Sequence, residues 1–139
     1  MFEKLIKKIA LNLDRAKIPY MLIGGQAVLL YGTPRLTRDI DITLGIDTDK
    51  FFSIEGICKK LGLKIIPKNP EKFANETKVL PVEEAGLKIR VDFIFSFTPY
   101  EKQALKRIKK VKIDGYLVKF VSCEDAIIHK MLAGRAIDK

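Results

Sequence analysis

The chain has 139 residues, of which 47% are hydrophobic and 31% are charged, with a formal net charge of +9 at pH 7. This length and composition favour a single globular domain with one sizeable core and argue against a disordered chain. No apolar run approaches the ~20 residues that span a bilayer, and the first residues lack the pattern of a signal peptide. We therefore expect a cytoplasmic protein with no membrane partner.

Basic residues outnumber acidic ones by 26 to 17, which favours a polyanionic partner such as nucleic acid or a nucleotide. Enrichment in lysine for thermal stability alone is the alternative. The only two cysteines, Cys58 and Cys123, lie far apart, and His129 is the only histidine. We expect two reduced, buried thiols, and a zinc site or a Cys-His catalytic pair has little support.

The N-terminal half alternates helical and extended patterns. Apolar residues at helical spacing predict a first helix, which Pro19 ends, and Asp39-Ile40-Asp41-Ile42 predicts a strand with two chemically different faces. In chain order we expect a helix over 2–17, a strand over 20–23, a short helix over 26–31, a strand over 39–44, a helix over 48–61, a strand over 63–66 and a loop over 67–75.

The C-terminal half predicts two hairpins and two helices. Asp114-Gly115 is a common pair in tight hairpin turns, and Ser122 begins a Ser-x-x-Asp capping pattern. In chain order we expect a hairpin of strands 77–82 and 87–95, a helix over 99–108, a hairpin of strands 111–113 and 117–120, and a helix over 122–134. Together the elements predict a fold of the α/β (α+β) class, with a mixed β-sheet flanked by helices.

Acidic residues inside apolar strands are the first candidates for chemistry. Asp39 and Asp41 emerge on one face of their strand, while Ile40 and Ile42 face the core. Two carboxylates this close repel each other unless a positive charge lies between them, and hard oxygen ligands favour Mg²⁺ or Mn²⁺. Asp92 is a third acid in an apolar strand, and the simplest partner for it is the same metal site, if the two strands are neighbours.

A structural alternative for these acids stays open. Asp39 and Asp41 would then line a solvated edge of the sheet, and Asp92 would pair with Arg90 or with a lysine. Strands with one polar face are common, so the acids alone do not decide between the two interpretations.

The glycine pair Gly24-Gly25 follows a predicted strand and begins a predicted helix. Unpaired backbone N–H groups at a helix start attract anions, and the missing side chains let a phosphate approach the backbone. An ordinary strand-to-helix turn is the alternative for the glycines by themselves. Followed by the Asp-x-Asp strand, they predict a phosphate cradle beside a metal site.

The combination of these residues resembles the defining motif of the DNA polymerase beta-like nucleotidyltransferase superfamily. The motif is carried by Ile23-Gly24-Gly25 and Asp39-Ile40-Asp41-Ile42. Gly24-Gly25-Gln26-Ala27, Gly32 and Thr37-Arg38 are similar to small bacterial and archaeal nucleotidyltransferases of the abortive-infection toxin type. The late segment from Ser122 to Lys130, with Gly134-Arg135 and Asp138, also matches that group.

The resemblance implies a nucleotidyltransferase fold and an enzyme that transfers a nucleoside monophosphate from a nucleoside triphosphate (NTP) to a hydroxyl, releasing pyrophosphate. It implies that Asp39, Asp41 and Asp92 are the catalytic and metal-binding residues, with Mg²⁺ or Mn²⁺ as cofactor. It implies nucleotide or phosphate binding by Gly24, Gly25, Thr37, Arg38 and Lys130. The atom that Arg38 contacts stays open, and a solvated helix lysine explains Lys130 equally well.

No residue determines the acceptor, and none determines which NTP is used; ATP is one of the candidates. The resemblance implies tRNA or the partner protein of a two-component, toxin-antitoxin-like system, with a small molecule such as an aminoglycoside as a further option. Relatives continue past Asp138 into more helices, so we expect 1–139 to be a single nucleotidyltransferase domain without that extension. The alternatives are a catalytically silent nucleotide-binding or regulatory module and, less in keeping with the acids, a plain RNA-binding domain.

Overall fold

The computed structural model describes residues 2–23, 39–86, 88–96, 98–122 and 125. The predicted short helix over 26–31 and most of the predicted last helix therefore lie outside the described residues. None of the helices in the described ranges combines the length and apolar character needed to cross a bilayer.

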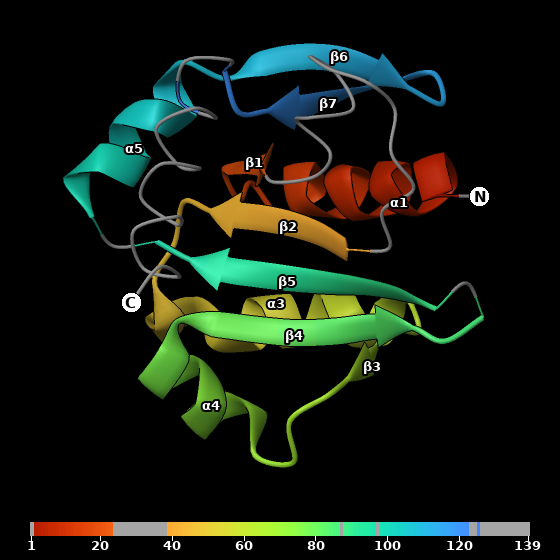
Figure 1. Ribbon diagram of the computed structural model, residues 1–139, viewed down its shortest axis with the longest axis vertical. Helices are drawn as coiled ribbons and strands as arrows, with labels where there is room; N and C mark the ends of the chain where they lie inside the picture. Colours follow the sequence, from red (N-terminus) through yellow and green to blue (C-terminus); the bar gives the residue numbers. More distant parts are fainter. Residues whose placement is uncertain (1, 24–38, 87, 97, 123–124, 126–139) are drawn as a thin grey trace, which may run out of the picture.

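The described chain combines helices and strands in an α+β arrangement (Figure 1). The elements are α1 (Phe2–Arg15), β1 (Tyr20–Ile23), β2 (Asp39–Leu44), the 3-10 turn η1 (Thr48–Lys50), α3 (Phe51–Lys60), β3 (Lys64–Ile65), α4 (Pro70–Thr77), β4 (Val79–Glu84), β5 (Ile89–Phe95), α5 (Pro99–Lys106), β6 (Lys109–Ile113) and β7 (Tyr116–Phe120).

The strands form one seven-stranded sheet in the order β3-β4-β5-β2-β1-β7-β6. β2 runs parallel to β5, and β1 runs parallel to β7, while the other neighbours are antiparallel. This confirms the predicted mixed sheet. It also makes β2 and β5 neighbours, which was the condition for bringing the three acids together.

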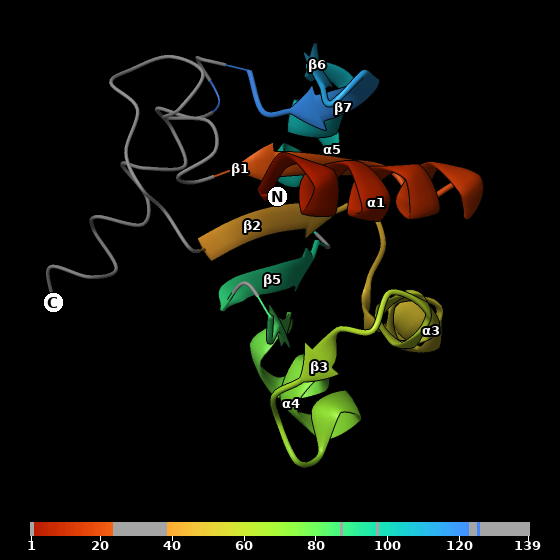
Figure 2. The same cartoon turned by 90° about the vertical axis from the view of Figure 1, so that its right-hand side faces the viewer.

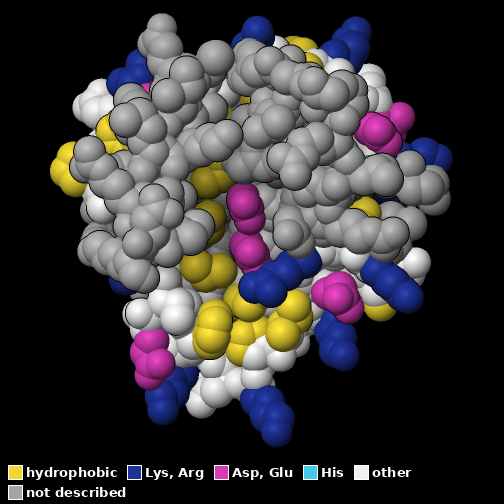
Figure 3. Space-filling model, in the orientation of Figure 1, with side chains coloured by type: hydrophobic (Ala, Val, Ile, Leu, Met, Phe, Trp, Pro, Cys, Tyr) yellow, Lys and Arg dark blue, Asp and Glu magenta, His cyan; other side chains and the backbone are white. Residues whose placement is uncertain are grey.

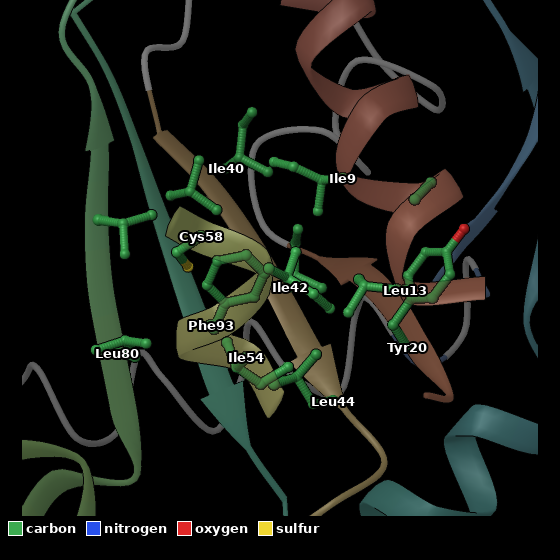
Figure 4. Close-up of a cluster of buried hydrophobic side chains, with 14 of the residues drawn as sticks. Ile9, Leu13, Tyr20, Ile40, Ile42, Leu44, Ile54, Cys58, Leu80 and Phe93 are labelled. Atoms are coloured by element: carbon green, nitrogen blue, oxygen red, sulfur yellow. The ribbon is translucent and has the colours of Figure 1, made fainter. Parts of the chain in front are cut away.

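One face of the sheet is covered by α1 and α3 and holds the main core (Figure 2). Figure 4 shows Ile40, Ile42 and Leu44 of β2 pointing into this cluster with Phe93 of β5. All four side chains are buried, so the alternation of Asp and Ile in β2 does separate a core face from a polar face.

Two local predictions are confirmed in detail. The turn between β6 and β7 has positive φ at both Asp114 (+50°) and Gly115 (+81°), as the tight hairpin turn requires. Cys58 is a buried free thiol, and burial raises its pKa to about 12, while Cys123 lies outside the described residues. A thiol with so high a pKa carries almost no thiolate at neutral pH and is chemically inert.

The predicted loop over 67–75 is wrong, because α4 occupies Pro70–Thr77. The helix buries only Ala74, so its sequence shows no apolar stripe that the 3.6-residue period would reveal. Its start does carry a helix signal, since Pro70 is at the first helical position and Glu71 follows in the first turn. Lys78 ends the helix in the left-handed region (φ +64°), and β4 therefore begins at Val79, two residues later than predicted.

Candidate active site

Two of the three predicted acids are direct neighbours on the sheet face opposite α1 and α3. The parallel register of β2 and β5 sets Asp41 against Asp92, and Asp39 against Arg90. Asp41 is half-buried, and the side chain of Asp92 is 23% exposed. Figure 3 shows acidic side chains meeting at the centre of this face, over β2 and β5. For Asp39 the structure describes the backbone position only.

A basic side chain borders the acids. Arg90 Nε donates a hydrogen bond to Asp92 Oδ1 at 3.0 Å, and the two side chains form an ion pair. The pairing of Asp92 with Arg90 is the contact that the structural alternative predicted. The same alternative placed Asp39 and Asp41 at a solvated edge of the sheet, whereas β2 is an internal strand between β5 and β1.

The predicted phosphate-binding residues Gly24, Gly25, Thr37, Arg38 and Lys130 lie outside the described residues. The described chain nevertheless places the end of β1. Its last residue, Ile23, pairs with Asp41 on the side of β2 away from β5. In the sheet, β1 therefore flanks the acidic pair on one side, and β4 flanks it on the other.

Thr43 is a polar residue on this face that the sequence did not single out. Its side chain is buried, and its Oγ1 has no hydrogen-bond partner among the described residues. Thr43 pairs with Met21, which packs against Ala104 of α5, so it lies where α5 covers the face. We do not count Thr43 as a candidate metal ligand. A metal ion beside Asp41 must be accessible to the substrate, and the buried side chain of Thr43 is not accessible.

The donor chemistry of the acidic pair fits a divalent cation with a preference for oxygen. Two carboxylates on opposed residues of adjacent strands have their Cβ atoms roughly 5 Å apart, which lets both reach one small ion. Among the described side chains no group of three acids, histidines or cysteines forms a metal site. The side chain of Asp39, the third acid of the predicted set, is not among the described side chains.

A second polar cluster fixes α5 to the chain that follows β7. Asp125 is buried, and it accepts hydrogen bonds from Arg107 Nη2 (2.9 Å) and Nε (3.1 Å) and from Tyr100 Oη (2.9 Å). Its backbone N–H donates to Ser122 Oγ (3.1 Å), as in the predicted capping pattern. The hydrogen bonds from the Arg107 guanidinium hold the pKa of Asp125 below its ordinary value, although burial opposes them.

We predict that Asp125→Asn removes part of the acid sensitivity of folding. A carboxyl whose pKa is lowered in the folded state stabilises the fold above its ordinary pKa of ~3.9, and this contribution is lost as the pH falls through the lower folded-state value. Denaturant unfolding of both proteins over a pH series should show a difference of about 1–3 kcal/mol at neutral pH that shrinks below about pH 4. A constant difference over that range would contradict the ionic role of Asp125, and exposed Asp49→Asn is the control.

Several solved structures of other proteins share this fold. The antibiotic-resistance factor ANT(2″)-Ia superposes with a TM-score of 0.67 at 19% identity, over 97% of this chain and 72% of its own. A Thermotoga maritima protein described as a candidate nucleotidyltransferase gives 0.67 at 19% identity, over 99% and 87%. The lincosamide antibiotic adenylyltransferase LnuA gives 0.56 at 17%, over 84% and 77%. At these identities the similarities establish a nucleotidyltransferase fold.

Sequence comparison adds the family. No curated protein sequence matches the chain. Residues 1–139 do match the family described as a nucleotidyltransferase of unknown function, DUF6036. Because this match runs from the first residue of the sequence to the last, the protein belongs to that nucleotidyltransferase family.

Proposed function

We propose that the protein transfers a nucleoside monophosphate from an NTP to the hydroxyl of an acceptor, with Asp39, Asp41 and Asp92 as the acids of the active site. The observation that carries this proposal is the parallel register of β2 and β5, which sets Asp41 against Asp92 on the sheet face that α1 and α3 leave uncovered. The family assignment supports the same reaction class.

The acids would hold Mg²⁺ or Mn²⁺. When bound, the cation supplies positive charge that offsets the charge of the triphosphate and of the developing pyrophosphate. Asp41 is the central ligand of this proposal, because it lies between Asp39 on its own strand and Asp92 on the next one. Hard carboxylate oxygens at these positions suit either ion.

The residues of the chain would perform the remaining steps. Backbone N–H groups at Gly24 and Gly25, with Thr37, Arg38 and Lys130, would bind the phosphates. The acceptor oxygen forms a bond to the α-phosphorus, and the bond from that phosphorus to the oxygen bridging the β-phosphate breaks. Pyrophosphate leaves with the electron pair, and the proton of the acceptor hydroxyl passes to the Asp92 carboxylate.

For the acceptor we propose tRNA or a partner protein of a toxin-antitoxin-like pair, in keeping with the basic charge of the chain and its resemblance to toxin-type enzymes. A small molecule is the second candidate, because two structural neighbours are an antibiotic-resistance factor and an antibiotic adenylyltransferase. Lincomycin is bound in the solved structure of LnuA, and adenylyl-2″-tobramycin in one of ANT(2″)-Ia, so lincomycin and tobramycin belong in the acceptor screen.

The direct test is calorimetric titration of the purified chain with each of the four NTPs, with and without magnesium. We expect heat of binding for at least one NTP that requires the cation, because the acids and the triphosphate repel each other without it. That NTP then becomes the donor in the acceptor screen. Absence of binding under every condition would contradict an active site complete within this chain.

A further inference from the structure

A hollow of about 420 Å³ lies beside the acidic pair, at the edge of the sheet where α4 packs. Residues of the β3–α4 connection, α4, β4 and β5 line it, among them Ile66, Lys68, Lys72, Phe73, Pro81 and Arg90. Figure 3 shows hydrophobic side chains gathered below the central acids on this face, with basic side chains at their border. The volume is that of a site for a small ligand or for one residue of a polymer.

The hollow is continuous with the acids through two of its residues. Pro81 pairs with Asp92 across β4 and β5, so both lie in one row with Asp41. Arg90 lines the hollow and also bonds Asp92 at 3.0 Å. A molecule in the hollow therefore reaches Asp92 before it reaches Asp41.

Two apolar side chains that line the hollow are exposed to solvent. Phe73 is 37% exposed and Ile66 is 45% exposed, and they are two of the four exposed large hydrophobic residues in the described chain. The whole of α4 buries only Ala74, so the helix contributes little to the core. Backbone bonds from Ile66 N–H to Pro81 (3.1 Å) and from Phe73 N–H to Asn69 (3.0 Å) nevertheless fix both residues. Fixed, exposed apolar groups of this kind indicate a binding surface.

The lysines of the hollow favour an anionic occupant. Lys68 and Lys72 line it together with one acid, Glu76, and with Arg90, whose charge is paired with Asp92. Neither Lys68 nor Lys72 forms an ion pair with any residue that the structure describes. An exposed aromatic ring next to lysines is the arrangement that binds a single-stranded nucleic acid, by stacking a base and neutralising its phosphates.

We propose that this hollow binds the terminal nucleotide of a single-stranded RNA acceptor. The base packs on Phe73 and Ile66, the adjoining phosphates face Lys68 and Lys72, and the terminal ribose hydroxyl lies toward Asp92. The strand order separates this acceptor from the donor, because the hollow lies on the β4 side of the acids and β1, which leads to Gly24, lies on the other side. The inference rests on the proposed transferase function.

The group transfer in this arrangement involves the terminal ribose hydroxyl of the RNA. Its oxygen forms the bond to the α-phosphorus of the NTP, the bond from that phosphorus to the β-bridging oxygen breaks, and pyrophosphate departs. The hydroxyl proton passes to Asp92, which is the acid next to the hollow. The RNA leaves one nucleotide longer.

The test is fluorescence anisotropy of an end-labelled, unstructured oligoribonucleotide with the full chain in EDTA, where no transfer takes place. Phe73→Ala is expected to weaken binding about 5- to 150-fold, the range for losing one stacked base. Phe52→Ala is the matched control, because Phe52 is a 63% exposed phenylalanine on α3, which covers the other face. Equal affinities of the two variants would overturn the proposal.

The lysines give a second, independent readout. The Lys68→Ala/Lys72→Ala double variant should lower the slope of log affinity against log salt by roughly 0.7 for each phosphate that the lysines no longer neutralise. Lys59→Ala/Lys60→Ala, at the exposed end of α3, removes the same charge from elsewhere and should leave the slope unchanged. Identical slopes in the two double variants would overturn the placement of the phosphates.

Failure of this inference and failure of the transferase function are distinguishable. Magnesium-dependent NTP binding by Phe73→Ala should equal that of the unaltered chain, because the hollow is not the donor site. NTP binding without Phe73-dependent RNA binding overturns the acceptor site alone. RNA binding that depends on Phe73 without any NTP binding supports the hollow and contradicts the transferase. Label from an α-labelled NTP appearing on protein rather than on RNA would overturn RNA as the acceptor.

Discussion

Replacing Asp41 by asparagine is expected to abolish magnesium-dependent NTP binding while the protein stays folded. Asp41 is the central acid of the proposed set, with Asp39 on the same strand and Asp92 opposite it. The amide has nearly the same shape but carries no negative charge, so it is a poor ligand for a hard cation. The half-buried position lies outside the main hydrophobic core, so the far-ultraviolet circular dichroism and the melting temperature should change little.

The comparison is made by calorimetric titration of both proteins with the NTP that the unaltered chain binds. Asp49→Asn is the matched control, because it makes the same chemical change at an exposed residue of η1. We expect this control to bind the magnesium–NTP complex as the unaltered chain does. Undiminished, magnesium-dependent binding by Asp41→Asn would contradict the assignment of the site.

Replacing Phe93 by alanine is expected to lower the free energy of unfolding by about 3–5 kcal/mol, as for other large core side chains. Phe93 follows Asp92 in β5 but points to the opposite face of the sheet, where it is fully buried. Its ring lies in the cluster with Ile42 and Ile54, beneath α3 (Figure 4). Truncation leaves a cavity that this sheet and helix cannot close without moving.

Denaturant unfolding of the variant and of Phe52→Ala measures the effect. Phe52 is mostly exposed on α3, so its truncation should cost less than about 1 kcal/mol. Since small domains are stable by only about 5–15 kcal/mol, Phe93→Ala is accompanied by Phe93→Leu, which keeps more of the apolar volume and should lose less. Similar losses in Phe93→Ala and Phe52→Ala would contradict the assignment of Phe93 to the core.

The sequence predicted well those features that depend on neighbouring residues. The Asp-Ile alternation of β2 identified one core face and one polar face, because strand side chains alternate with a period of two. Asp114-Gly115 identified the β6–β7 turn, since these residues tolerate positive φ. Strand ends were less accurate, because α4 continues to Thr77 and Lys78 follows it in the left-handed region, so that β4 begins only at Val79.

The sequence also singled out Asp41 and Asp92 as candidate residues and made their meeting conditional on adjacent strands. The sheet order supplies that adjacency, which no local pattern encodes, because β2 pairs with a strand far along the chain. The roles of Gly24, Gly25, Thr37, Arg38 and Lys130 stay predictions, since these residues lie outside the described part of the chain.

Composition and local patterns were enough to identify the chemical character of the protein: a basic α+β chain with a glycine pair and acids in apolar strands. Which residues share a surface could be seen only in the folded chain. The hollow beside Asp92 is lined by residues of α4, of the connection before it and of two strands. The sequence of α4 did not predict this surface, because the helix buries only Ala74 and has no apolar stripe. Local propensity and periodicity are properties of short segments, whereas a binding surface forms from contacts between segments that only the folded chain brings together.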